Sequence, residues 1–301
     1  PYIQERIRGN PASCQAKAEG SNLCALLGLD DKMGHELLED GFPFAEGALS
    51  GRRALICGAS KGIGRACALM LARAGCGVIA CARSEEELKD LVLEMHGDSH
   101  EYRVLDLEDL DEVRRVAKEI SDSGPVEILL NNSGGPPRSP LLDNEIIDFD
   151  SPFRRHLHAS HELVRALVPG MVKSGMGRIV NIISISVREP IDGIGLSNTL
   201  RGAMASWSKS LSRELDPCIT INNILPGYTD TDRLVEFANS MSSRNGKPIG
   251  EIYQGWRDAT PIGRLIDPME IGSAVVWLSL PATSAVRGMS LAVDGGRLRT
   301  I

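Results

Sequence analysis

A glycine-rich segment is the first part of the sequence whose residue types and spacing could do chemistry. The residues GASKGIG occupy positions 58–64, between a short apolar run and a longer amphipathic stretch. We expect Gly58 to allow a sharp turn, Gly62 to let the backbone approach a pyrophosphate, and Gly64 to let a helix pack closely on a strand. Amides at the helix N-terminus would face the phosphate. The predicted phosphate site also includes Ser60, Lys61 and Ile63.

The end of the second apolar run indicates which dinucleotide would bind. This run, at 77–82, is followed directly by Arg83 and Ser84, where a site selective for NAD usually places an acidic residue against the ribose hydroxyls. Arg83 can form a forked contact with a ribose 2′-phosphate, Ser84 can donate to it, and Lys61 adds a second positive charge. The alternative is a pair of solvated basic residues. Their coincidence with these two positions favours NADP(H).

Apolar runs alternate with amphipathic stretches from Arg52 onward, and this pattern predicts the elements that hold these residues in place. The segments between the first six runs have the length and composition of helices, and Ser84 with Glu87 three residues later predicts a capping box. Seven strands separated by helices predict a Rossmann-like, doubly wound, mainly parallel sheet in a three-layer α/β/α fold. The expected strands are 52–57, 77–82, 102–106, 126–130, 177–183, 218–224 and 289–293.

The spacing G-x-x-x-G-x-G resembles that of the short-chain dehydrogenase/reductase family, and in particular its bacterial 3-oxoacyl-carrier-protein reductases. The resemblance extends from about residue 49 to residue 297 and includes six further motifs in the family's order. These are Asp106-Leu107 after the third run, NNSG (131–134) where the family has NNAG, GRIVNIIS (177–184), PGYTDT (226–231), ATPIGR (259–264) and VDGG (293–296).

This resemblance implies further cofactor contacts. Asp106 and Leu107 would hold the adenine. Three residues would flank the adenosine ribose side and four would cover the nicotinamide; these are Asn132, Ser133 and Gly134, and Pro226, Gly227, Thr229 and Thr231.

Three of the four catalytic positions of the family are altered in this chain. Family members use a serine, a tyrosine and a lysine in YxxxK, and an asparagine. Ser184 matches the serine, but the tyrosine position 13 residues further on is Ser197 and the lysine position is Arg201. The asparagine position aligns with His156. None of the four tyrosines has a lysine four residues later, so the YxxxK motif is absent from the chain.

These substitutions change the chemistry that the site can perform. A serine hydroxyl is a far weaker acid than a tyrosine, so Ser197 does not replace the tyrosine directly. Arg201 can hold ribose hydroxyls but stays protonated and cannot relay protons. Ser184 and Ser197 could still hydrogen-bond a carbonyl oxygen, which leaves the proton donor missing. His156 is a candidate because its ordinary pKa suits proton transfer at neutral pH; alternatively, it hydrogen-bonds the backbone as the asparagine does.

Arginines gather around the expected cleft. Arg138 and Arg188 lie in loops that border the cleft in relatives, and Arg154 and Arg155 precede His156. Their density predicts an anionic substrate, a carboxylate or an acyl-carrier-linked group; solvated surface charge is the alternative. His158 and His161 are three residues apart, but no carboxylate or cysteine completes a ligand set, so we expect no metal site.

Composition and charge exclude several classes of function. The chain has 301 residues, with 33 Lys and Arg against 40 Asp and Glu and a net charge of −7. A net-negative chain without basic runs is a poor binder of nucleic acid or anionic membranes. It has no apolar run of about 20 residues for a bilayer span and no signal-peptide pattern at its start. The seven cysteines lack metal spacings, so we expect free thiols and a cytoplasmic protein.

Residues 51–301 are expected to form a single short-chain dehydrogenase/reductase domain. Residues 1–50 interrupt the alternating pattern. They predict a partly helical extension, with a helical candidate at Leu23 to Leu38, that packs on the main domain or on a neighbouring subunit. The polar stretch 229–258 is expected to be an irregular, mobile substrate flap.

The family resemblance also implies a homodimer or homotetramer. The helix from about 195 to 213 and the end of the chain are the usual contacts. In this chain an exposed apolar stripe is expected on that helix, formed by Leu200, Met204 and Trp207.

Three functions are compatible with these residues. The leading prediction is an NADP(H)-dependent oxidoreductase with a non-standard active site, acting on a small carbonyl or alcohol. The second is a non-redox enzyme on the same fold that uses His156 and Ser184 for acid–base chemistry. The third is a catalytically silent NADPH-binding protein. The fold does not choose among them, because function depends on the site.

Overall fold

The computed structural model describes residues 36–39 and 41–300, which belong to one compact unit spanning Lys32–Ile301. At its centre is a seven-stranded sheet in the order β3-β2-β1-β4-β5-β6-β7, and every pair of neighbours is parallel. The predicted doubly wound sheet is therefore confirmed. The strands are β1 (Arg53–Cys57), β2 (Gly77–Ala82), β3 (Glu101–Val104), β4 (Ile128–Asn131), β5 (Gly177–Ile182), β6 (Ile219–Pro226) and β7 (Ser290–Val293).

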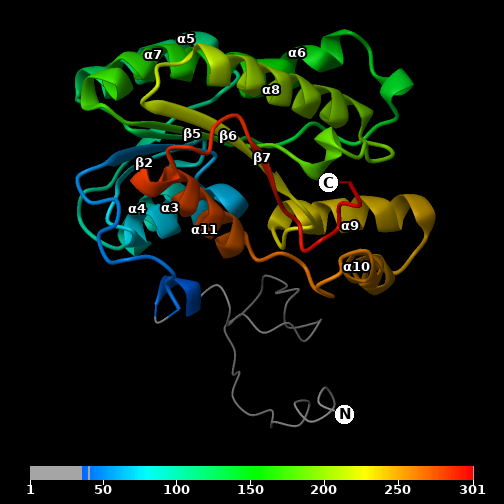
Figure 1. Cartoon of the computed structure of the whole chain (residues 1–301). Coiled ribbons are helices and arrows are strands. Elements are labelled where there is room, and N and C mark those ends of the chain that lie inside the picture. The colour runs from blue at the N-terminus through cyan, green and yellow to red at the C-terminus, as the bar shows by residue number, and fades with distance from the viewer. Residues whose placement is uncertain (1–35, 40, 301) are drawn as a thin grey trace. The chain divides into compact units, whose positions relative to one another are not determined.

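Helices cover both faces of the sheet (Figure 1). One apolar core lies between the sheet and α3, α4 and α11, and a second lies between the sheet and α5 and α7, with α8 beside them. Strands β1, β4 and β5 are buried on both faces, which explains their nearly continuous apolar sequences. The helix bounds are α3 (Gly62–Arg73), α4 (Glu85–Glu94), α5 (Leu110–Asp122), α7 (Ala159–Ser174), α8 (Gly195–Glu214) and α11 (Pro268–Ser279).

The strand order reverses between β1 and β4, and this point determines where the site lies. The chain leaves β1 toward β2 and β3 on one side, and β4 begins the series that runs toward β7 on the other. Connections therefore diverge at the carboxyl ends of β1 and β4, which opens a crevice there. The phosphate loop follows β1 and the NNSG turn follows β4, so both lie at this crevice.

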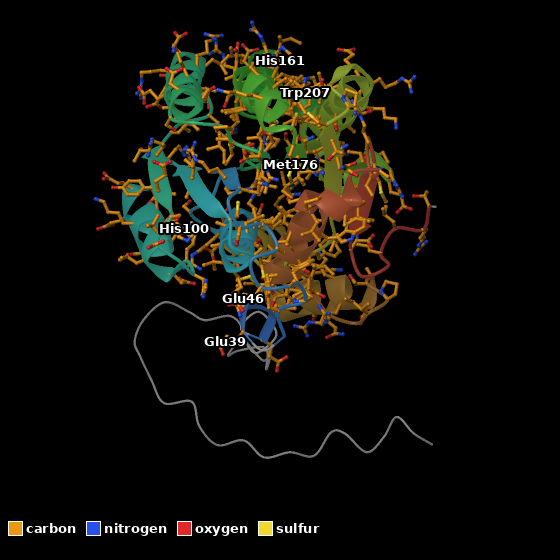
Figure 2. All side chains as sticks on the ribbon, turned by 60° about the vertical axis from the view of Figure 1, so that its left-hand side comes forward. Glu39, Glu46, His100, His161, Met176 and Trp207 are labelled. Atoms are coloured by element: carbon orange, nitrogen blue, oxygen red, sulfur yellow. The ribbon has the colours of Figure 1, made fainter. Side chains whose placement is uncertain are left out.

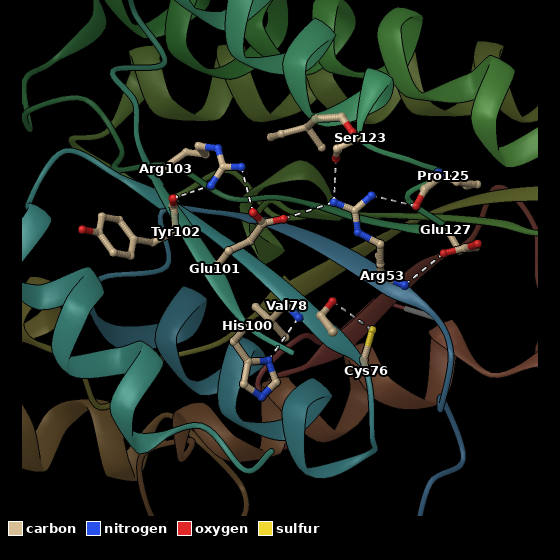
Figure 3. Close-up of polar contacts among 12 residues, drawn as sticks. Arg53, Cys76, Val78, His100, Glu101, Tyr102, Arg103, Ser123, Pro125 and Glu127 are labelled. Carbon is tan, nitrogen blue, oxygen red and sulfur yellow. Dashed lines mark hydrogen bonds and ion pairs between the residues drawn. The ribbon is translucent and has the colours of Figure 1, made fainter. Parts of the chain in front are cut away.

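A polar network joins the amino-terminal ends of several strands, at the end of the sheet opposite the crevice (Figure 3). The guanidinium of Arg53 donates to Glu101 Oε1 at 3.1 Å, to Ser123 Oγ at 3.0 Å and to Pro125 O at 3.4 Å. The buried carboxylate of Glu127 accepts from the Arg53 amide at 2.9 Å. These contacts bind the starts of β1, β3 and β4 together. The polar network therefore stabilises the end of the sheet that lies away from the crevice.

The segment 229–258 is not irregular, which corrects the expectation from its polar composition. It forms α9 (Asp232–Asn245) and α10 (Ile249–Asp258). Leu234 and Ala238, four residues apart, are buried on α9, and Ile252, Tyr253 and Trp256 are buried on α10. Each helix thus has an apolar face that packs inward while the polar residues remain outside. Mobility of this segment stays a prediction.

The remaining helical elements bring the chain from β4 to β5. They are η1 (Leu141–Asp143), α6 (Ile147–Phe153) and a π-helix, η2 (Arg154–His158), which continues directly into α7. Two further short turns are η3 (Ile185–Val187) and η4 (Pro281–Thr283). A π-helix widens the backbone and often marks a functional position. Here it carries His156.

Two expectations about α4 and α8 are wrong. Ser84 is the N-cap residue of α4, but its side chain makes no capping hydrogen bond to the helix. Glu87 pairs with Lys61 at 2.6 Å. On α8, Leu200 and Met204 are buried within this chain and so form no exposed stripe. The indole of Trp207 donates to His161 Nδ1 of α7 at 3.3 Å (Figure 2).

Most of the predicted helix at Leu23 to Leu38 lies outside the described residues. The described part of the N-terminal extension packs on α3. Leu49 is buried there, Phe42 lies under the guanidinium of Arg73 at 5.2 Å, and Arg73 Nε donates to Leu38 O at 2.9 Å.

Other expectations can be compared with the same residues. The cysteines within the described ranges are free: Cys57, Cys67, Cys76 and Cys81 are buried, and Cys218 is partly exposed. Burial raises the pKa of the Cys57 thiol to about 12. Within residues 36–39 and 41–300, no helix is long and apolar enough to cross a bilayer, and no cluster of His, Cys, Asp or Glu has the arrangement of a metal site.

Candidate active site

The phosphate loop has the geometry that its glycines predict. Gly58 adopts φ +61, and a Cβ there would lie 2.7 Å from Asn132 Nδ2. A Cβ on Gly64 would clash with the carbonyl oxygen of Gly58. Gly62 opens α3 and faces Thr231, whose Cγ2 would be 3.1 Å from a Cβ at this position. The loop, a helix N-terminus and the start of the α9 segment therefore meet at one point.

A hollow beside this loop carries mixed charge. Lys61 Nζ lies 2.6 Å from Glu87 Oε1, and the hydrogen bond that Lys61 donates to Glu87 raises the pKa of Lys61. Arg83 is exposed at the end of β2 and, within the described residues, has no hydrogen-bond or ion-pair partner. Arg83 is thus free to bind a phosphate, whereas Lys61 is shared with Glu87. The hollow is lined by Ser60, Lys61, Gly62, Arg65, Glu87, Asp90 and Asp232.

The residues expected near the adenosine follow the ends of β3 and β4. Asp106 accepts from the amide of Glu108 at 3.0 Å, which shapes the turn after β3. Leu107 packs against the core under α5 and α7. Asn132 donates to both Cys57 O and Gly58 O at 3.3 Å. This last contact ties the end of β4 to the beginning of the phosphate loop.

The segment expected over the nicotinamide follows β6 directly. Pro226 ends that strand, and Gly227 lies so close to Asp294 that a Cβ would be 2.8 Å from its Cα. Thr229 is buried and forms a bridge with Ile266, and Thr231 is the N-cap residue of α9. The segment therefore passes from the sheet edge to the phosphate loop. The glycine cradle, the α3 N-terminus and the unpaired Arg83 together fit a phosphorylated dinucleotide.

Ser184 lies two residues after β5, with one lone pair already used. Its Oγ accepts from the amide of Ser186 at 3.0 Å, which caps the short turn η3. A hydroxyl that accepts from an amide keeps its own proton available to donate. Ser184 can therefore donate a hydrogen bond to an oxygen placed in the crevice.

Ser197 and Arg201 lie one helical turn apart on α8. Arg201 is buried, and its Nη1 donates to Ile182 O at 2.8 Å, at the end of β5. Burial, together with the positive charge of Arg233, lowers the pKa of Arg201 to about 10. Arg201 is therefore still protonated at neutral pH and contributes a positive charge at the end of β5, one helical turn after Ser197.

His156 contacts another position at which this chain departs from the family. Its Nδ1 is 2.7 Å from Ser133 Oγ and its Nε2 is 3.0 Å from Gly134 O. Because a carbonyl only accepts, Nε2 must carry the proton, and Nδ1 accepts from the serine hydroxyl. Burial, with additional repulsion from Arg201 and Arg155, holds the pKa of His156 well below its ordinary value. The ring is neutral at pH 7 and fixes the NNSG turn, the backbone-bonding alternative considered for this position.

The arginines expected at the cleft have different environments. Arg188 donates to Ser290 O at 3.0 Å, and Arg138 donates to Asp192 O at 3.1 Å. Arg154 is exposed, whereas Arg155 is half-buried and its Nε has no partner within the described residues. Four arginines near one cleft thus do not form a single anion site.

A continuous stack of arginine and aromatic rings was not expected from the sequence. Arg138 lies 4.0 Å from the ring centroid of Phe237, which stacks on Trp256 at 5.5 Å. Trp256 stacks in turn on Tyr228 at 5.2 Å, and Arg297 covers Tyr228 at 4.3 Å. This stack joins the β4 loop, α9, α10 and the C-terminal segment. The sequence feature that could have indicated this stack is the concentration of aromatic residues at 228–256, in a chain with only 4% aromatic residues.

Arg233 is a second residue that the sequence did not identify. It lies in the first turn of α9, and its Nη2 donates to Pro136 O at 3.0 Å and Gly135 O at 3.4 Å. The loop after β4 is therefore held from α9 by Arg233 and from the stack by Arg138. These contacts close the α9 side of the crevice.

Comparison with known proteins agrees with this geometry. Residues 58–297 match the family model described as enoyl-(acyl carrier protein) reductase. Gluconate 5-dehydrogenase of Gluconobacter oxydans is 34% identical over 83% of this chain and 95% of its own length. The 3-oxoacyl-[acyl-carrier-protein] reductase of Vibrio harveyi is 30% identical over 82% of this chain and 98% of its own.

Solved structures give the same result. L-sorbose reductase of Gluconobacter frateurii, crystallised with NADPH and L-sorbose, superposes with a TM-score of 0.80 at 27% identity and covers 85% of this chain and 100% of its own. With the parallel sheet, the phosphate loop and these relatives in agreement, the chain belongs to the short-chain dehydrogenase/reductase family.

Proposed function

We propose that the protein is an NADP(H)-dependent oxidoreductase that acts on a small carbonyl or alcohol without the family's tyrosine–lysine pair. The observation that carries this proposal is Arg83, whose exposed guanidinium directly after β2 has no partner within the described residues. A forked donor at this position suits a ribose 2′-phosphate. L-sorbose reductase, a relative of the same fold, was crystallised with NADPH. When bound, the nicotinamide supplies or accepts the hydride.

The chain's own residues orient the substrate in this proposal. Ser184 donates a hydrogen bond from its hydroxyl to the substrate oxygen and keeps its proton, since its Oγ already accepts from the amide of Ser186. Ser197 adds a second hydroxyl, and Arg201 one turn later holds ribose hydroxyls and contributes positive charge. His156 stays neutral and holds the NNSG turn in position. The proton for the substrate oxygen therefore comes from water or from the substrate itself.

The proposed substrate carries an anionic group, a carboxylate or an acyl-carrier-linked phosphate. Arg201 and Arg233 repel each other, and within the described ranges the only hydrogen bond of the Arg201 side chain goes to a backbone carbonyl. A buried guanidinium without a carboxylate leaves local positive charge that a negative ligand would balance. This imbalance supports an anionic substrate class.

A catalytically silent NADPH-binding protein is the second candidate. It is favoured by Arg201, whose guanidinium binds the carbonyl of Ile182 instead of lying free in the crevice. Non-redox acid–base chemistry through His156 is disfavoured, because both ring nitrogens are already bonded.

One experiment separates these candidates. The purified chain is titrated with NADPH and NADH, and NADPH consumption is then followed with a panel of keto sugars, keto acids and 3-oxoacyl thioesters. Consumption that falls at least 100-fold in Ser184→Ala but not in Thr199→Ala, an exposed position on α8, supports the oxidoreductase. Tight NADPH binding without turnover over the whole panel supports the silent protein. Failure to bind NADPH refutes both.

We also propose that the protein assembles as a homodimer or homotetramer through α8 and its surroundings. The support is the family relationship, since the expected apolar stripe is buried within the chain. Light scattering at micromolar concentration tests it, and a monomer would contradict it.

A further inference from the structure

A ladder of asparagine side chains crosses four strands of the sheet. Asn131, Asn181 and Asn223 are register partners on β4, β5 and β6, and Asn223 pairs with Ser290 on β7. Asn131 Nδ2 donates to Asn181 Oδ1 at 2.8 Å, Asn181 Nδ2 donates to Asn223 Oδ1 at 2.9 Å, and Asn223 Nδ2 donates to Ser290 Oγ at 3.1 Å. Every amide donates toward β7. The free end of the ladder is therefore an acceptor on β4.

That free end is buried without a partner. Asn131 is 5% exposed, and its Oδ1 has no hydrogen bond within the described residues. It lines a narrow cavity of about 10 Å³ that is also lined by Ser133, Arg155 and His156. Arg155 also lines this cavity, and its Nε is buried and has no hydrogen-bond partner among the residues that the structure describes. Two residues that line the same cavity thus lack a partner: Asn131 Oδ1 is an acceptor without a donor, and Arg155 Nε is a donor without an acceptor.

We propose that this cavity is a binding site for a single structural water molecule. The water donates to Asn131 Oδ1, accepts from Arg155 Nε, and gives its second O–H to Ser133 Oγ. Buried waters typically make about three such bonds to groups that are otherwise unsatisfied, and a cavity of this volume holds one water. A buried polar atom without any partner is disfavoured, which is the driving force for occupancy.

The water connects the sheet to the turn at the cofactor crevice. Arg155 belongs to the π-helix η2 and immediately precedes His156, which bonds Ser133 and Gly134. The ladder, the water and Arg155 together fix this helix against β4. Asn131 and Arg155 are therefore positioning residues that act on the NNSG turn through the water and His156. This consequence for the turn rests on the proposed cofactor site, whereas the water site does not.

A crystal structure of the full chain that resolves ordered waters tests the site directly. We expect one peak within hydrogen-bond distance of both Asn131 Oδ1 and Arg155 Nε. A dry cavity, or direct protein partners for both atoms, would overturn the proposal.

Matched variants test the positioning role. Arg155→Met removes the Nε donor, and Arg154→Met changes the exposed arginine beside it. We expect Arg155→Met to lose the water, to shift the ¹⁵N resonances of the His156 ring and to raise the Kd for NADPH about tenfold. Arg154→Met should keep the water, the His156 resonances and the Kd for NADPH of the wild type. Arg155→Lys should show the same losses as Arg155→Met, because its ammonium lies beyond the position of the Arg155 Nε.

The outcomes separate this inference from the proposed function. A chain that binds no NADPH refutes the cofactor assignment, while the wild-type crystal structure and the His156 resonances still test the water. A water that persists in Arg155→Met, or unchanged His156 resonances in that variant, refutes the positioning network even if NADPH binds.

Discussion

The buried His156 makes the stability of the fold depend on pH in a way that can be calculated. In the unfolded chain its imidazole titrates near 6.5, whereas in the folded chain burial and the two arginines hold its pKa well below that value. Unfolding therefore takes up a proton below pH 6.5, and the stability contributed by this group is lost as the pH falls from 6.5 toward the folded pKa. Between pH 7 and pH 5 the loss is about 1.9 kcal/mol if the folded ring stays neutral throughout.

His156→Gln isolates this contribution, because the amide does not titrate. The assay is reversible urea unfolding of both proteins at pH 5, 6 and 7. Between pH 7 and pH 5 the free energy of unfolding of the wild type should fall more than that of the variant, by up to about 1.9 kcal/mol, whatever the two absolute stabilities are. Groups that both proteins share cancel in the difference.

His158→Gln is the matched control on the same π-helix. The side chain of His158 is exposed, so this variant should keep the pH dependence of the wild type. If His156→Gln and wild type show the same slope, the ring is not held neutral. The argument against His156 as a proton donor then fails, and a pH–rate inflection near 6–7 would support catalysis by this residue.

Three further variants test the phosphate site. Arg83→Ala should weaken the binding of NADPH by about 1.5 kcal/mol, roughly a tenfold rise in Kd, and should hardly change the binding of NADH. Equal losses of affinity for both cofactors in a fluorescence titration would refute the assignment of Arg83 to the 2′-phosphate. Glu87→Gln should release Lys61 and strengthen the binding of NADPH by up to about threefold, because an exposed ion pair contributes only modestly. Weaker NADPH binding in the same titration would contradict this. Gly64→Ala should destabilise the fold by roughly 3 kcal/mol, since its Cβ meets Gly58 O, and an unchanged melting temperature would refute the close packing.

The sequence alone determined the sheet and the phosphate loop. Strands such as Arg53–Cys57 and Gly77–Ala82 were predicted within a residue, because a strand buried on both faces needs a continuous apolar run. The positive φ at Gly58 was equally predictable, since few other residues adopt it without strain. These features depend on neighbours in the chain, so a local pattern specifies them.

Only the tertiary structure decided the roles of the polar site residues. The sequence left His156 as either a proton donor or a backbone partner. Its environment comes from Ser133, 23 residues away, and from Arg201, which lies still further along the chain. Similarly, Ser84 makes no capping hydrogen bond, and Glu87 pairs with Lys61, a residue of the phosphate loop that is distant in the sequence. Burial and long-range charge determine a pKa or an ion pair, and neither is encoded in local spacing.

The α8 and α9 helices illustrate the same division. The apolar spacing of Leu200 and Met204 correctly predicts one face of a helix, but not whether that face meets solvent, a second subunit or this chain's own core. The order of segment 229–258 likewise depends on rings that stack between α9, α10 and the loop after β6. Periodicity fixes which side chains share a face, because the helical repeat is local. What covers that face depends on contacts between distant segments, which exist only in the folded chain.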